Sequence, residues 1–188
     1  FQTNRGGEID MENKVICAGF GGQGVMSMGQ LLAYAGMIED KHVSWLPSYG
    51  PEMRGGTANC GVTVSDEEIG SPIITNDADI AIVMNLPSLI KFEKDVKPGG
   101  KIFINSSLIE RKVERTDIEV YYIDANKIAA DIGNIKAANL VMLGAVLKST
   151  PIVDIESILE AFKKVFGPSK ERFIPQNREA LVKGGESI

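Results

Sequence analysis

A glycine-rich segment near the amino terminus has the spacing of a phosphate-binding turn. Gly19, Gly21 and Gly24 satisfy the pattern G-x-G-x-x-G directly after an apolar run at residues 15–18 and before a helical pattern at residues 25–38. Such a turn directs backbone N–H groups and a helix amino terminus at an anion, so it could bind a phosphate or diphosphate. The candidate binding residues of this turn are Gly19, Gly21, Gly22, Gln23 and Gly24.

The second half of a dinucleotide fingerprint is missing from the sequence. That fingerprint also needs an acidic residue at the end of the second strand, about 20 residues further on, to hold the ribose. Glu39 and Asp40 come before the predicted second strand at residues 41–46, and its far end carries no acid. Because the same glycines are needed merely to turn the chain between a buried strand and its helix, a nucleotide site and a structural turn both stay open.

A second glycine-rich segment, at residues 47–57, combines prolines, glycines, an aromatic hydroxyl and two charges. Loops carry function more often than frameworks do. Arg54 could form a bidentate contact with a carboxylate or phosphate. Glu52 could instead be its partner in a surface ion pair that contributes little. The candidate residues of this segment are Ser48, Tyr49, Gly50, Glu52, Arg54, Gly55 and Gly56.

The remaining reactive side chains are few. Cys17 and Cys60 are the only cysteines and form no C-x-x-C pattern, so the chain cannot supply the four thiolates of an iron–sulfur cluster or a structural zinc. His42 opens a predicted strand and has no obvious serine or cysteine partner, which favours a structural role. We therefore predict neither a catalytic residue nor a metal ligand in this chain.

The elements that would position these loops alternate along the sequence. Strands are predicted at residues 15–18, 41–46, 57–64, 78–84, 101–105 and 120–123, and helices at 25–38, 86–96, 125–132, 136–148, 154–166 and 176–183. We expect Pro47 to end the second strand, residues 98–100 to form a turn, and Asp124 to cap its helix. The alternation predicts an α/β fold, a Rossmann-like three-layer sandwich with a mostly parallel sheet and a helical C-terminal part.

Length and composition exclude several classes of protein. Residues 1–10 look like a tag or leader, and residues 11–188 are long enough for a single domain. The net charge of −5 without a basic run argues against nucleic acid, and no apolar stretch approaches about 18 residues, which argues against a membrane span. The cytoplasm is the expected compartment, since no signal peptide is recognisable.

The predicted helix at residues 136–148 is apolar on nearly all sides. Such a helix must be buried. It could lie in the core of its own domain or in an interface with another chain, and Gly144 would permit close approach of a neighbouring backbone in either case.

The two glycine-rich segments together resemble a known family. Residues 18–25 (AGFGGQGV) followed by residues 48–57 (SYGPEMRGGT) are similar to the gamma subunit of the 2-oxoacid:ferredoxin oxidoreductases. The similarity continues through residues 98–100 and 139–147 and covers nearly all of residues 11–182. The glycine loop alone would be weak evidence, whereas both segments in this order and spacing are strong evidence.

The resemblance implies a division of labour among subunits. Such enzymes oxidatively decarboxylate a 2-oxoacid to acyl-CoA and CO2 and reduce ferredoxin. Thiamine diphosphate with magnesium is expected between alpha and beta subunits, and 4Fe-4S clusters in the beta and delta subunits. The gamma subunit would bind none of these cofactors alone. Its glycine loop and Arg54 would contact coenzyme A phosphates or close the site against water.

The resemblance also implies partners and a substrate class. The expected partners are the alpha, beta and delta subunits and ferredoxin, with a homodimer possible in isolation. Residues 48–52 look more like the 2-oxoglutarate and 2-oxoisovalerate versions than the pyruvate version, and indolepyruvate ranks lower still. Two alternatives stay open: a free-standing dinucleotide-binding enzyme, either a dehydrogenase or a methyltransferase, and a purely structural assembly subunit.

Overall fold

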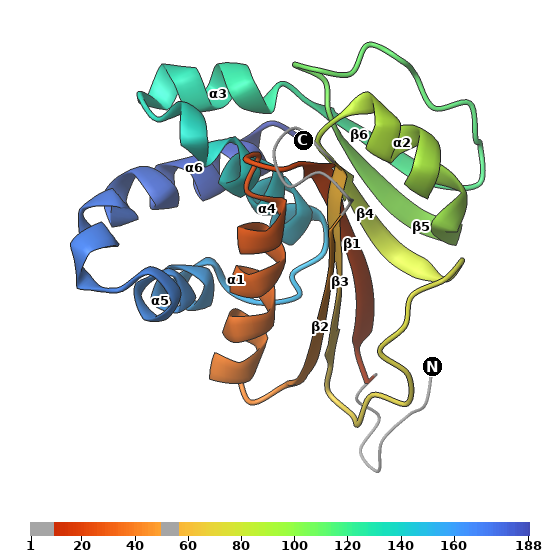
Figure 1. Cartoon of the computed structure of the whole chain (residues 1–188), viewed down its shortest axis with the longest axis horizontal. Coiled ribbons are helices and arrows are strands. Elements are labelled where there is room, and N and C mark those ends of the chain that lie inside the picture. The colour runs from red at the N-terminus through yellow and green to blue at the C-terminus, as the bar shows by residue number, and fades with distance from the viewer. Residues whose placement is uncertain (1–9, 50–56) are drawn as a thin grey trace.

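The computed structural model describes residues 10–49 and 57–188, which form a six-stranded sheet covered by helices (Figure 1). The strands are β1 (Glu12–Phe20), β2 (His42–Tyr49), β3 (Thr57–Ser65), β4 (Ala78–Val83), β5 (Val96–Asn105) and β6 (Glu119–Ile123). The α-helices are α1 (Val25–Ile38), α2 (Leu86–Phe92), α3 (Ala125–Ile132), α4 (Ala138–Ser149), α5 (Ile155–Phe166) and α6 (Ile174–Glu186). Short 3-10 helices are η1 (Glu93–Asp95), η2 (Ile135–Ala137) and η3 (Pro168–Phe173).

The sheet has the strand order β2-β3-β1-β4-β5-β6 and is mostly parallel, as predicted. β1, β4, β5 and β6 are parallel, whereas β3 is antiparallel to both β1 and β2 and separates them. Only residues 50–56 connect β2 to β3. A connection this short can turn the chain back but cannot form the crossover of a dozen or more residues that a parallel return needs.

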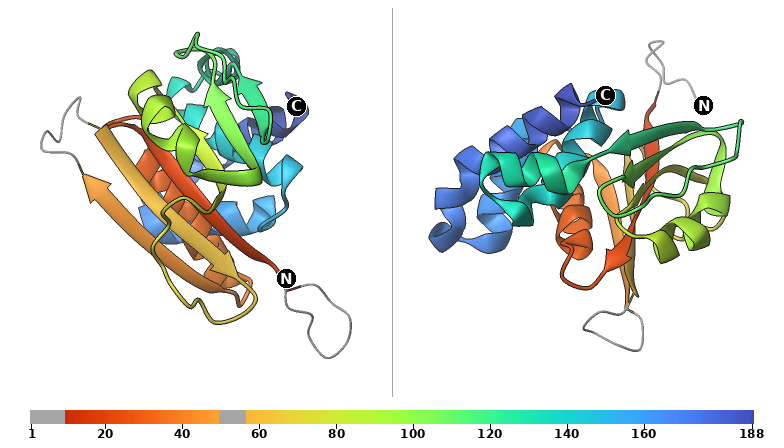
Figure 2. Two further views of the ribbon diagram at one scale, coloured as in Figure 1. Left: turned by 90° about the vertical axis from the view of Figure 1, so that its right-hand side faces the viewer. Right: turned by 90° about the horizontal axis from the view of Figure 1, so that it is seen from above.

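Helices cover both faces of the sheet, which confirms the expected sandwich. α1 and α4 to α6 lie on one face, and α2 lies on the other (Figure 2). Val15 and Cys17 of β1 point into the larger helical layer, while Ile16 and Ala18 point to the α2 side. Burial on both faces explains why the centre of β1 reads as a continuous apolar run.

Several predicted element boundaries were wrong. The helix expected at residues 86–96 ends at Phe92, and Val96 already begins β5. Pro47 does not end the second strand, because β2 runs to Tyr49; β2 is an edge strand, where a missing N–H is tolerated. Residues 98–100 lie within β5 and do not form a separate turn. Gly99 has φ +82° there, and the register between β4 and β5 shifts between Ala78 and Ile80, so the glycines absorb a bulge inside a strand.

The capping prediction at Asp124 was also wrong. Asp124 occupies the N-cap position of α3, but its side chain makes no capping hydrogen bond. The Ser107 hydroxyl, from the loop after β5, accepts the Asn126 N–H at 3.0 Å and donates to the Asp124 carboxylate. A residue distant in sequence therefore caps the helix, which a local pattern cannot reveal.

The apolar helix is buried within its own chain. Residues 138–147 of α4 are all buried, and α4 packs closely on α6. Gly144 lies against the backbone of Leu181, and Gly184 lies against the backbone of Val141. Any side chain at either glycine would overlap the facing helix, so this close pairing explains both the glycines and the missing polar face.

Candidate functional site

The glycine loop lies at the point where the sheet changes its winding direction. After β1 the chain crosses to α1 on one face, and after β4 it crosses to α2 on the other (Figure 1). In open α/β sheets, ligands bind at the carboxyl ends of the strands at such a switch point. Residues 21–24 after β1 and residues 84–86 after β4 border it.

Gln23 fills the interior of the glycine loop. Its Oε1 accepts the Phe20 N–H at 2.7 Å, and its Nε2 donates to the Met84 carbonyl at 3.2 Å. The Met84 N–H in turn donates to the Ala18 carbonyl at 2.9 Å. The side chain of Gln23 thus joins the two sides of the switch point and pairs the Phe20 N–H within the chain.

Two glycines of the pattern are required by contacts within the chain. A Cβ at Gly19 would lie 2.6 Å from Gln23 Oε1 and 2.9 Å from Met84 Cβ. Gly24 adopts φ +76°, and a Cβ there would lie 2.5 Å from Nδ2 of Asn139, which donates to the Gly24 carbonyl at 3.1 Å. Gly22 is different: it is exposed, and a Cβ on it would meet nothing within 4 Å.

The strand register brings the ends of the second glycine segment beside the glycine loop. Tyr49 of β2 pairs with Ala58 of β3, and Ala58 pairs with Gly19 of β1. Ser48 is exposed one residue earlier. The other candidate residues of this segment lie outside the described residues: Gly50, Glu52, Arg54, Gly55 and Gly56.

Sequence reasoning missed a set of asparagines at the same edge of the sheet. Asn85 follows β4, and its Oδ1 caps α2 by accepting the Ser88 N–H at 2.9 Å. Its Nδ2 is buried with no partner among the described residues. Asn105 ends β5 fully buried and donates to Asn126 Oδ1 at 2.9 Å. The proline at position 87 was the available signal for Asn85, because an asparagine N-cap with a proline in the first helical turn marks a helix start.

The two cysteines are neighbours in space. Cys17 of β1 and Cys60 of β3 are register partners, both buried beneath α1. The hydrogen bond with Cys60, together with full burial, raises the pKa of the Cys17 thiol well above its usual value. Within residues 10–49 and 57–188, no group of three or more His, Cys, Asp or Glu side chains could hold a metal ion.

The switch point offers binding groups but no titratable side chain within its loop, since residues 19–24 are four glycines, a phenylalanine and a glutamine. His42 is exposed at the start of β2, at the other end of the strands from the glycine loop, and pairs there with Ser65. Backbone N–H groups at Gly22 and the start of α1 can attract an anion, but they cannot exchange a proton with a substrate. Among the described residues, no helix is long and apolar enough to cross a membrane.

These features define a doubly wound α/β domain with a glycine loop at its switch point. The chain belongs to the pyruvate ferredoxin/flavodoxin oxidoreductase family, whose model matches residues 14–187. The similarity of the two glycine segments to gamma subunits is thereby confirmed and extends across the described fold.

Three relatives show the range of this similarity. The chain is 42% identical over 176 residues to ketoisovalerate oxidoreductase subunit VorA of Methanothermobacter thermautotrophicus, covering 93% of this chain but only 36% of that protein. It is 33% identical to 2-oxoglutarate synthase subunit KorC of Methanothermobacter marburgensis, covering 95% and 97% of the two chains. The solved gamma subunit of a keto/oxoacid ferredoxin oxidoreductase from Geobacter sulfurreducens superposes with a TM-score of 0.77 at 29% identity, covering 93% and 97%.

Proposed function

We propose that this chain acts as the gamma subunit of a complex that converts a 2-oxoacid and coenzyme A to acyl-CoA and CO2 while reducing ferredoxin. The observation that carries the proposal is its end-to-end match to subunits of such oxidoreductases. Alpha, beta and delta subunits would hold thiamine diphosphate with magnesium and the 4Fe-4S clusters. The chain's own residues support this division, because its two cysteines are buried on adjacent strands.

The favoured substrate is 2-oxoisovalerate, with 2-oxoglutarate second and pyruvate behind both. Identity to the ketoisovalerate subunit is 42%, against 33% to the 2-oxoglutarate subunit and 31% to a pyruvate/ketoisovalerate common subunit of Thermococcus litoralis. Since the reacting carbonyl would be held by other subunits, this ranking depends on family likeness. Comparing kcat/KM for the three acids in the assembled complex tests it directly.

The role proposed for this chain is to contact the phosphates of coenzyme A and to exclude water. Gly22 is exposed at the turn, and the start of α1 presents backbone N–H groups. Arg54 belongs to the segment that precedes β3, whose first residue, Thr57, pairs with Phe20 of β1. Gln23 would shape the turn, because its amide bonds to Phe20 and Met84.

A purely structural subunit is the second candidate. The internal bonding of Gln23 and the packing of Gly19 and Gly24 favour it, because these residues would be needed to shape a contact surface even without a ligand. The two candidate functions predict different kinetics for a complex that contains a variant of this chain.

Reconstitution separates the two candidates. Leaving out the chain should abolish acyl-CoA formation under the first proposal, whereas a complex that assembles without it and still reduces ferredoxin at the full rate would contradict that proposal. In the complete complex, Arg54→Ala should raise the KM for coenzyme A about tenfold with little change in kcat, as expected for a lost charged contact made in ground state and transition state alike.

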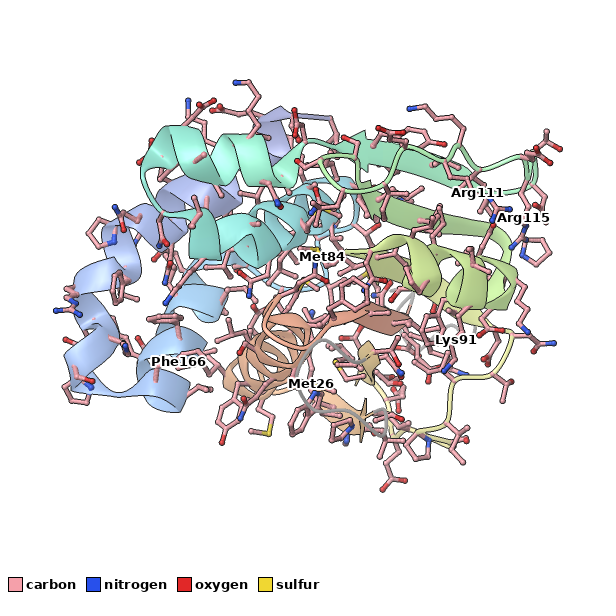
Figure 3. All side chains as sticks on the ribbon, turned by 45° about the horizontal axis from the view of Figure 1, so that its top comes forward. Met26, Met84, Lys91, Arg111, Arg115 and Phe166 are labelled. Carbon is pink, nitrogen blue, oxygen red and sulfur yellow. The ribbon has the colours of Figure 1, made fainter. Side chains whose placement is uncertain are left out.

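The matched control is Arg111→Ala, which removes an exposed arginine from the loop after β5 (Figure 3). It should leave the KM for coenzyme A unchanged. An Arg54→Ala complex with wild-type KM would remove Arg54 from the site and favour the structural role.

A further inference from the structure

Two neighbouring elements, α1 and β2, carry no charged side chain. The 14 residues of α1 and the 8 residues of β2 include no Asp, Glu, Lys or Arg, although 24% of the whole chain is charged. A helix at the surface of a soluble domain normally directs charged residues toward the solvent. The composition of these two elements therefore favours a protein partner over water.

β2 forms one open edge of the sheet (Figure 2). It pairs with β3 along one side, and in the described part of the chain no strand lies beyond it. Proteins usually protect such an edge with charged side chains, prolines, bulges or a covering element. β2 has one proline, Pro47, and no charge. The part of the strand before Pro47 can therefore pair with a further strand.

One side of α1 is buried in the core, and the opposite side is apolar and partly exposed. Met28 and Ala35 are fully buried. Met26, Tyr34 and Met37 lie on the other side of the helix, where Tyr34 is 37% and Met37 is 49% exposed. Methionine adapts well to irregular contact surfaces, so this side of α1 is suited to packing against another protein.

α1 lies directly over β2, so the exposed side of α1 and the open edge of β2 form one continuous surface. A Cβ at Gly36 would lie 2.6 Å from Val43, and a Cβ at Gly29 would lie 3.2 Å from Trp45 Nε1. Leu46 adds an exposed apolar side chain on the other face of the strand. We call the exposed side of α1 and the open edge of β2 the α1–β2 surface.

The charge distribution favours a second copy of this chain as the partner. In a dimer with a two-fold axis the same surface meets itself, so a charge near the axis would face a like charge. The net charge of the chain is −5, yet the two elements of the α1–β2 surface carry none of it. A two-fold axis perpendicular to the sheet also makes two β2 strands antiparallel and brings both α1 helices to the same face of the sheet.

We propose that the α1–β2 surface is a homodimer interface. The β2 strands of two copies pair antiparallel across a two-fold axis, and the apolar sides of the two α1 helices pack against each other. The two six-stranded sheets then form one continuous sheet. The proposal does not depend on the function proposed above, because it concerns two copies of this chain alone.

Sedimentation velocity of the full chain at increasing concentration tests the proposal. One strand edge and one helix side per copy make an interface at the small end of the usual range, so we expect a reversible dimer with a Kd of about 10 μM. A chain that stays monomeric far above that concentration would overturn the proposal.

Paired variants locate the interface. The double variant Met37→Lys and Leu46→Lys changes two exposed side chains of the α1–β2 surface and should raise the Kd of the dimer about tenfold or more. The matched double variant Ile90→Lys and Ile135→Lys adds the same charge at exposed apolar positions in α2 and η2 and should change the Kd less than about twofold. Circular dichroism checks that both variants fold. Equal losses in the two double variants would place the contact elsewhere.

A charge exchange at Tyr34 tests whether α1 meets its own copy. Tyr34→Lys and Tyr34→Glu should each weaken the dimer, because like charges then face each other across the axis. A mixture of the two variants should associate more strongly than either variant alone. Association of the mixture no stronger than that of the single variants would overturn the packing of α1 on α1.

Amide hydrogen exchange tests the strand pairing. Exchange of the amides at residues 42–46 should slow as the concentration of the chain passes the Kd, whereas β6, the strand at the other edge of the sheet, should not change. Protection of residues 42–46 that appears only when the subunits of the complex are added would overturn pairing between copies and assign the edge to a strand of another subunit. Neither result affects the reconstitution test of the gamma-subunit role.

Discussion

The glycine loop and a cavity beside α1, lined by Lys136, Lys170 and Asn177, meet at the amino terminus of that helix, but their polar groups differ in one respect. In the loop, the Gln23 amide and the Gly24 carbonyl are already bonded within the chain. In the cavity, Asn177 and two lysines are left without partners among the described residues. The polar groups of the glycine loop, which has a recognisable sequence pattern, are therefore mostly bonded within the chain. The cavity has no such pattern, and a buried side-chain amide in it has no partner among the described residues.

The largest effect is expected where α4 packs on α6. Gly144→Ala places a Cβ against the backbone of Leu181, so α4 and α6 must separate. Overpacking of this kind costs about 1–3 kcal/mol and here should reach the upper end, since backbone cannot rotate away. Urea unfolding followed by circular dichroism measures it.

Gly70→Ala is the control for that substitution, because a Cβ at Gly70 meets nothing within 4 Å and its φ lies outside the left-handed region. It should change the free energy of unfolding by less than about 0.5 kcal/mol. Equal stability of the two variants would show that the α4–α6 contact is not as close as described.

The next effect tests whether the glycine loop is held by its own glutamine. Gln23→Ala leaves the Phe20 N–H and the Met84 carbonyl without their partner, which should cost about 1–3 kcal/mol of unfolding free energy. In the complete complex, the same variant should have a lower thermal stability and an unchanged KM for coenzyme A. A stable variant with a raised KM would reverse the comparison and make Gln23 a ligand.

A smaller effect is expected at the ion pair between Lys14 and Asp77, far from both regions. The hydrogen bond from Lys14 lowers the pKa of Asp77, so the pair stabilises the fold above the unfolded pKa of aspartate, about 3.9, and this contribution is lost as the pH falls through the lower folded value. Because the Asp77 side chain is 45% exposed, Asp77→Asn should cost less than about 1 kcal/mol at pH 7.

Unfolding curves of both proteins between pH 2 and pH 7 check this prediction. The difference between wild type and Asp77→Asn should shrink toward the acid end. A difference that stays constant with pH would mean that the carboxylate charge does not stabilise the fold.

The smallest effect concerns the thiols beneath α1. Cys17 and Cys60 are both buried, so neither thiol is accessible in the folded protein, even though the hydrogen bond with Cys17 lowers the pKa of the Cys60 thiol while that of Cys17 is raised. A thiol reagent should label neither cysteine in the native protein over minutes and both in urea. Rapid native labelling would show that the layer between α1 and the sheet opens readily.

Sequence patterns predicted most elements and the fold class, because alternation and helical spacing are local. α1 was predicted with its observed bounds, Val25–Ile38, from apolar spacing alone. The antiparallel insertion of β3 was not predicted, since it depends on pairing Glu12 with Ser65 across the intervening chain. The inward turn of Gln23 and the unpaired amide of Asn177 were also missed, because each depends on an element distant in sequence. Asn139 is a polar residue in the first turn of the otherwise apolar helix α4. Its hydrogen bond to the Gly24 carbonyl, which no sequence pattern reveals, explains its presence there.

The insertion of β3 also bears on how the chain reaches its native state. β2 and β3 form a hairpin whose pairing is local, whereas β1 must find β3 across a much longer stretch of chain. Short loops close at lower entropic cost, so the hairpin can assemble first and then offer a ready edge to β1. The order of assembly would therefore run from the edge of the sheet inward, with β1 joining a hairpin that already exists.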